Sequence, residues 1–291
     1  MIKLNLPVQC QNYEKLIESC RNSIKRDNYG IKQKLLNDEK TLLRFARIYE
    51  KLASCNKLFR LNKFILKNAN DAIFNNCELT NDNMNYLYKN IFCRKKIEGF
   101  YDSILNYAKD PLIQCPFCGG ISEPTEIDHF LPKSLHAQYT IFPYNLVPIC
   151  KDCNQSYKKT FYPKNKNDQL IHPYLDEDCY FNDKWLYATC KIDSNFKISE
   201  VEFYVTPPDY WDKDKKDKIQ FHFKKFELNK RFAIKAATEI SCLNNIIFSL
   251  KNEFNSIEKI LNCVINNKDF SINYWKIVLY RAIKDTLIKE Y

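Results

Sequence analysis

The stretch CPFCGGISEPTEIDHF, residues 115–130, decides how the rest of this sequence is interpreted. It contains a Cys-x-x-Cys pair and, further on, an aspartate followed by a histidine: Cys115, Cys118, Asp128 and His129. All four side chain types bind metals in proteins, but thiolates and carboxylates favour different ions. Two of the chain's four glycines, at 119 and 120, follow the second cysteine directly. The stretch therefore indicates a metal centre, and the question is whether it holds one ion or two.

A second pair, Cys150-Lys-Asp-Cys153, follows 31 residues after the first. Four thiolates in two such pairs are typical of a closed, tetrahedral structural zinc site. A chain that turns tightly around a metal needs positive φ angles, which glycine adopts without strain, so Gly119 and Gly120 fit this interpretation. Two alternatives stay open: chance pairs in a cysteine-rich chain, and a redox pair, which would favour a βαβ context.

Oxygen ligands accompany the cysteine pairs. Asp128 lies between the two pairs, and Asn154 directly follows the last cysteine. Carboxylate and amide oxygens suit Mg²⁺ or Mn²⁺, whereas thiolates select zinc. The pattern therefore predicts two adjacent and chemically distinct metal sites.

Residues 115–159 resemble an HNH endonuclease of the four-cysteine type, which has a ββα-metal fold. The matching positions are the two cysteine pairs, Asp128-His129 followed by LPKS, Asn145 before LVPIC, and Asn154 followed by Lys158-Lys159. The resemblance covers 45 residues of the 291. The third named position of the motif is asparagine here instead of histidine, a variant that occurs within the family.

The resemblance implies a role for each matching residue. His129 is the general base that takes a proton from the attacking water, and a neutral histidine suits this role at pH 7. Asp128 and Asn154 hold the catalytic Mg²⁺ or Mn²⁺ against the scissile phosphate. Asn145 holds the loop that orients His129, and the zinc clamps the strand to the following helix.

Further side chains near the motif have a functional and an ordinary structural interpretation. Lys133, Lys158 and Lys159 are predicted to contact phosphate, the alternative being a solvated face. Glu126 could share a strand face with Asp128 and is interpreted as a supporting residue or a bystander. The roles of His136 and His172 stay open between auxiliary ligand, base contact and local packing. His222 is predicted to be structural.

Composition limits the other function classes. The chain has 13 cysteines, an odd number, which does not indicate a disulfide framework and favours the reducing cytoplasm. Neither a signal peptide nor an apolar run of about 18 residues is visible, so no membrane association is expected. The formal net charge of +10 is compatible with nucleic acid as a partner, although coding drift towards AT-rich codons, which enriches lysine, would give the same balance.

Periodicity predicts an α+β fold, mainly a helical shell around a small metal-bearing core with an additional β-hairpin, and the resemblance implies that this core is a zinc-clamped ββα unit. Three regions are expected: helical residues 1–111, the metal core 112–165, and an extension 166–291. Apolar spacing predicts helices over 37–55, capped by Asn37 or Asp38, over 81–108, capped by Thr80 and ended by Pro111, and across 226–291. Residues 184–205 predict the hairpin, and the charged run 212–218 a solvated loop or helix start.

The leading hypothesis is thus a metal-dependent endonuclease that cleaves DNA. The layout also resembles HNH nucleases of bacterial antiphage defence, such as the Septu-type effector, which works with an ATPase partner. Cleavage of RNA, for example tRNA, is a second hypothesis, because the same chemistry acts on any phosphodiester that it can reach. A third is a non-catalytic, zinc-stabilised nucleic-acid-binding or scaffold protein, which would have no need of Asp128, His129 and Asn154.

Overall fold

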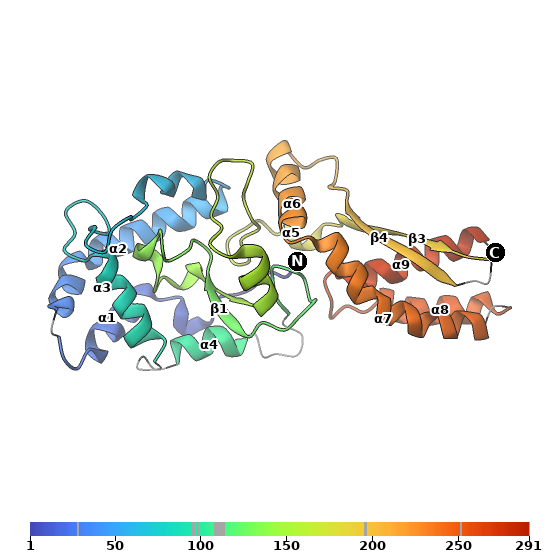
Figure 1. Ribbon diagram of the computed structural model, residues 1–291, viewed down its shortest axis with the longest axis horizontal. Coiled ribbons are helices and arrows are strands. Elements are labelled where there is room, and N and C mark those ends of the chain that lie inside the picture. Colours follow the sequence, from blue (N-terminus) through green and yellow to red (C-terminus); the bar gives the residue numbers. More distant parts are fainter. Residues whose placement is uncertain are drawn as a thin grey trace.

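The computed structural model describes residues 1–27, 29–94, 97, 99–107, 114–194, 197–250 and 252–290 (Figure 1). These residues form a mixed α+β fold with many helices and two small antiparallel hairpins. The molecule is elongated, with the N-terminal helices and the first hairpin at one end and the second hairpin with the last helices at the other (Figure 1). One continuous cluster of buried apolar side chains connects the two ends. No helix in the described part of the chain is both long and apolar enough to cross a membrane.

Helices make up the first part of the chain. They are η1 (Val8–Cys10), α1 (Tyr13–Ser23), α2 (Ile31–Ser54), η2 (Leu58–Phe64), α3 (Asn81–Tyr86), the π-helical η3 (Leu87–Phe92) and α4 (Phe100–Tyr107). Amphipathic spacing explains α1 and α2, which bury one face each and pack against one another. Helix α4 packs on the first hairpin, so this helical part surrounds the strands that carry the candidate site.

The predicted start of helix α2 is wrong. The helix begins at Ile31, where the carboxylate of Asp27 accepts hydrogen bonds from the N–H groups of Ile31 and Lys32 at 2.6 and 3.0 Å. Asp38 lies inside the helix and is buried, and its carboxylate accepts from the N–H groups of residues 78 and 79. The Asp38 carboxylate therefore binds the backbone of a distant loop and does not cap its own helix.

The predicted helix over 81–108 starts correctly but is not continuous. Thr80 caps it as expected, because its side chain accepts from Asn83 N–H while the Asn83 side chain accepts from Thr80 N–H. The helix then widens into the π-helical η3, and Gly99, with a φ of +71°, precedes a separate helix α4. A residue with positive φ cannot continue a right-handed α-helix, and glycine adopts this conformation without strain. The expected stop at Pro111 lies outside the described residues.

The first hairpin pairs β1 (Glu126–His129) with β2 (Leu146–Ile149) in antiparallel register, with Asp128 opposite Val147. The short helices η4 (Ala137–Tyr139) and η5 (Pro143–Asn145) lie in the connection between the strands. A helical segment follows β2 at residue 151 and continues as the π-helical η6 (Cys153–Lys158). The order strand, strand, helix is therefore present where the sequence predicts it.

The C-terminal part contains the second predicted hairpin, which is confirmed. Strands β3 (Leu186–Ile192) and β4 (Ile198–Val205) pair antiparallel and pack on α9 and α7 (Figure 1). The charged run starts helix α6, which Asp212 caps. The helices here are α5 (Cys179–Asn182), α6 (Lys213–Lys225), α7 (Leu228–Ser249), α8 (Phe254–Ile265) and α9 (Trp275–Glu290).

Candidate metal centre and neighbouring polar site

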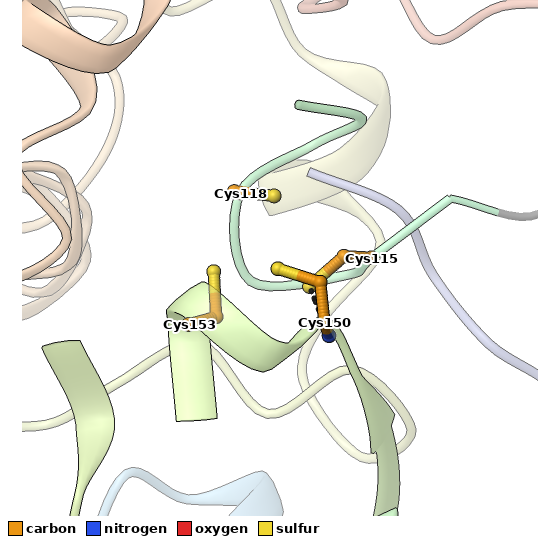
Figure 2. Close-up of side chains that lie close together, drawn as sticks. All are labelled: Cys115, Cys118, Cys150 and Cys153. Carbon is orange, nitrogen blue, oxygen red and sulfur yellow. Dashed lines mark hydrogen bonds between the residues drawn. The ribbon is translucent and has the colours of Figure 1, made fainter. Parts of the chain in front are cut away.

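The four paired cysteines come together in one buried cluster. Cys115 and Cys118 lie on the turn before β1, Cys150 directly follows β2, and Cys153 begins η6 (Figure 2). Their Sγ atoms all lie within 4.8 Å of one another, and each residue is at most 1% exposed. Among the histidine, cysteine, aspartate and glutamate side chains of the described residues, this is the group with three or more ligand atoms close enough to hold one ion.

The geometry and surroundings of the cluster fit zinc. Tetrahedral Zn–S bonds of about 2.3 Å place sulfur atoms about 3.8 Å apart, which is compatible with this spacing. Two donors point at the sulfurs: Cys150 N–H donates to Cys115 Sγ at 3.4 Å, and the guanidinium of Arg231 donates to Cys153 Sγ at 3.4 and 3.5 Å. A buried guanidinium directed at sulfur favours a thiolate over a neutral thiol, because the cation would otherwise lack a counter-charge.

The glycines after Cys118 have the predicted conformation. Gly119 and Gly120 have φ angles of +60° and +99°, and Gly119 N–H closes the turn by donating to Cys115 C=O at 2.9 Å. A Cβ on Gly120 would collide with the side chain of Gln114. The positive φ therefore favours glycine at 120, and the Gln114 side chain would have to move to admit a larger residue.

His222 of helix α6 supports the same turn from outside. Its Nε2 donates to Phe117 C=O at 2.8 Å while its Nδ1 accepts from Ile171 N–H at 3.2 Å, which fixes a neutral ring with the proton on Nε2. Burial lowers the pKa of His222 to about 3. The prediction of a structural role agrees with these contacts, which join α6 to the loop between the first two cysteines.

Asp128 and Lys158 form an ion pair beside the cluster. The Lys158 Nζ lies 2.6 Å from Asp128 Oδ2 and 2.7 Å from His129 C=O, and Lys158 is only 1% exposed. The alternative for Lys158, a solvated face, is therefore wrong, whereas its contact with phosphate stays a prediction. Its side chain extends from η6 back to β1, where it compensates the half-buried carboxylate.

Asn154 lies one helical turn before Lys158 and makes a parallel contact to the same strand. Its Nδ2 donates to Glu126 Oε2 at 2.7 Å, and Gln155 Nε2 donates to Glu126 Oε1 at 3.1 Å. Glu126 and Asp128 are two residues apart on β1 and share its half-exposed face. Because Nδ2 is directed at Glu126, the amide oxygen of Asn154 points away from that carboxylate.

His129 lies on the opposite, buried face of β1. Its Nε2 donates to Thr140 C=O at 3.0 Å, so Nδ1 carries the lone pair, and the ring edge packs on Tyr88 with 4.5 Å between centroids. Burial lowers the pKa of His129 to about 3, with a smaller lowering from Lys133 and Lys158. The ring is thus neutral at pH 7, but in this environment it is a weak proton acceptor.

Asn145 is fully buried and binds the connection between the strands. Its Oδ1 accepts from Leu131 N–H at 2.8 Å and from the Tyr49 hydroxyl at 3.0 Å. Its Nδ2 donates to the C=O groups of Leu131 and Tyr139, both at 3.1 Å. All four hydrogen-bonding sites of the amide are used within the protein.

The remaining predicted residues are scattered around the site. Lys133 Nζ lies 4.9 Å from the centre of the Tyr88 ring, and Lys159 is exposed with a φ of +52°. His136 is buried, with no hydrogen-bond partner for either ring nitrogen among the described residues. His172 Nε2 is 3.3 Å from the Tyr49 hydroxyl, and burial lowers its pKa.

Sequence reasoning missed three residues that surround the site. Tyr88 packs on His129, Arg231 contacts Cys153, and the pKa of Lys225 is lowered by burial and then by the charges of Lys159 and Lys158. Each comes from a segment far from the motif, so no local spacing could have indicated it.

Comparison with known proteins gives one informative match. The chain is 28% identical over 297 residues to "Protein ea31" of Escherichia phage lambda, an alignment that covers 97% of each chain. No family model matches the chain, and no solved structure matches it. The similarity extends over the helical parts as well as the cysteine cluster, so the two proteins resemble each other along their full length.

Proposed function

We propose that this protein is a metal-dependent HNH endonuclease that hydrolyses phosphodiester bonds in DNA. The observation that carries the proposal is the alignment of η6 with β1. Asn154 contacts Glu126, and one turn later Lys158 contacts Asp128, so the segments that carry Asp128 and Asn154 lie side by side. The four-cysteine cluster lies beside them, with Cys153 at the start of η6 and Cys150 directly after β2, the partner strand of β1.

The polar groups have separate roles in this proposal. Asp128 and Asn154 offer one carboxylate and one amide oxygen, donors that suit Mg²⁺ or Mn²⁺. Such an ion, when bound, supplies charge neutralisation at the scissile phosphate. His129 accepts a proton from water at Nδ1, because Nε2–H is held by Thr140. Asn145 fixes the loop that includes Leu131, close to His129 in the chain.

The described conformation restrains this chemistry. Tyr88 packs against the His129 ring, and burial holds the pKa of His129 at about 3, well below the value near 7 that suits a general base. The ammonium of Lys158 forms an ion pair with Asp128 Oδ2. We therefore propose that the lone chain is weakly active, and that a regulatory protein, such as an ATPase of an antiphage defence system, moves the η3 segment away from His129.

The test uses purified protein with plasmid DNA, single-stranded DNA and tRNA, each with Mg²⁺, Mn²⁺ or EDTA, and with or without proteins encoded beside it. We expect metal-dependent DNA cleavage that increases when a partner is added. His129→Ala should abolish it, whereas His136→Asn, at a buried histidine outside the site, should retain it. Cleavage of tRNA alone would reassign the substrate to RNA. Absence of cleavage under all conditions would favour the non-catalytic scaffold.

The restraint has its own test in Tyr88→Ala. Removing the ring hydrates His129, which raises its pKa towards 6.5 and improves it as a base. Basal DNA cleavage by the lone chain should then rise by at least about tenfold at pH 7. Tyr101→Ala, at a neighbouring tyrosine of α4 that packs on Phe92, is the matched control. Vigorous plasmid digestion by the lone wild-type chain would contradict the restraint, but not the nuclease assignment.

A further inference from the structure

Arg231 connects the C-terminal helices to the cysteine cluster. It lies in the first turn of α7, directly after the α6–α7 junction, and is 7% exposed. Both terminal nitrogens point at Cys153 Sγ, at 3.4 Å for Nη1 and 3.5 Å for Nη2, and Nη1 also donates to Phe226 C=O at 3.3 Å. The guanidinium lies over the Tyr157 ring, 4.2 Å from its centre.

Among the groups that contact Arg231, the counter-charge is a thiolate of the cysteine cluster. No carboxylate forms an ion pair with it within the ranges that the structure describes. A buried guanidinium without an anion is costly, because it loses its hydration without compensation. Its contacts are a sulfur, a carbonyl oxygen and an aromatic face, and of these only the sulfur can bear a full negative charge.

The cysteine cluster, in turn, needs a positive charge beside it. Four thiolates around Zn²⁺ carry a net charge of about −2, and all four cysteines are buried. A guanidinium in contact with one sulfur removes about half of that excess charge. The cation and the tetrathiolate therefore each stabilise the other in a buried position.

We propose that Arg231 is a functional part of the zinc centre, and that it makes docking of α7 depend on zinc occupancy. Helix α7 packs on β4 and α9, so the dependence extends to the second hairpin and the C-terminal helices. Arg231 is a positioning residue that acts through Cys153. This inference concerns the zinc site and is independent of whether the protein cleaves nucleic acid.

Zinc affinity measured by competition with a chromogenic chelator tests the first half. Loss of a partner that contacts a metal ligand typically weakens metal binding by about 10–100-fold, and we expect this for Arg231→Met. Arg231→Lys keeps the charge but not the paired donors, so its loss should be smaller. Lys230→Met, at the exposed neighbouring position, controls for loss of a positive charge on α7 and should bind zinc like the wild type.

A change of ligand separates electrostatics from packing. Cys153→His leaves a Cys₃His site with one negative charge fewer and without the sulfur that Arg231 contacts. Arg231→Met should then weaken zinc binding by at least about tenfold less in this background than in the wild type. Equal weakening in both backgrounds, or unchanged affinity in the wild-type background, would overturn the electrostatic role.

Hydrogen exchange tests the second half. Removing zinc from the wild type with a chelator should accelerate amide exchange along α7, because Arg231 then faces neutral thiols. Lys230→Met should show the same dependence on zinc, whereas in Arg231→Lys it should be weaker. If Arg231→Met does not fold, Arg231→Lys carries both measurements. Exchange of α7 that is the same with and without zinc would refute the coupling.

Discussion

Asn145→Ala is the substitution for which the structure makes the most definite prediction. The amide is fully buried and binds the chain between the two strands of the first hairpin. Within the described residues, the N–H and C=O of Leu131 hydrogen-bond to this side chain and to no other group. The other two partners are less dependent on it, since Tyr139 C=O also accepts from Phe142 N–H and the Tyr49 hydroxyl also contacts His172.

The magnitude follows from the two groups that lose their only partner. A buried backbone group without a hydrogen bond costs about 1–3 kcal/mol, so the pair at Leu131 gives a loss of about 4 kcal/mol in unfolding free energy. Leu131 itself is 0% exposed, so water cannot easily replace the amide. For a chain of this size the loss corresponds to a fall in the thermal midpoint of about 10 °C.

The assay is thermal denaturation followed by circular dichroism, with zinc content measured in parallel. Asn154→Ala is the matched control, because that amide is half-exposed and its side-chain hydrogen bond within the described ranges goes to Glu126. It should lower the unfolding free energy by less than about 1 kcal/mol while removing nuclease activity. A fall below about 1 kcal/mol for Asn145→Ala would refute the view that Asn145 acts by holding the loop.

Three further predictions concern the metal, the base and pH. Cys150→Ser should abolish stoichiometric zinc in metal analysis and cost several kcal/mol of stability; folded, zinc-free wild type would contradict the site. His129→Ala should lower cleavage by about 10²–10⁴-fold with zinc content unchanged, and retained activity would exclude it as the base. All four histidines are buried with a lowered pKa, about 3 for His129 and His222 and about 4 for His136. The unfolded chain therefore binds more protons, so stability is complete above about pH 6.5 and is lost as pH falls, by about 2 kcal/mol per histidine at pH 5. His136→Asn should reduce that loss in denaturation experiments by about one histidine's share, and an unchanged loss would contradict the assignment.

Local chemistry in the sequence determined several parts of this protein. The cysteine pairs predicted the buried cluster, because ligand type and spacing are properties of short segments. Thr80 predicted a helix start, and the aromatic and β-branched run predicted the second hairpin, since capping and strand alternation depend on near neighbours. The same reasoning failed at Asp38, because a residue that can cap a helix can equally bind a distant loop.

Only the tertiary structure decided how the site is enclosed. Tyr88 reaches His129 from 41 residues earlier in the chain, and Arg231 reaches Cys153 from 78 residues later. Lys158, which looked like a surface cation, is buried because η6 lies along β1 and brings its ammonium to Asp128. Such contacts depend on how separate elements pack. Hydrophobic burial, which drives that packing, is non-directional, so apolar spacing indicates which face of an element is buried but not which distant residue it contacts. The sequence thus specified the cysteines of the candidate metal centre, whereas the packing of distant elements determined which charged and aromatic side chains lie around the site.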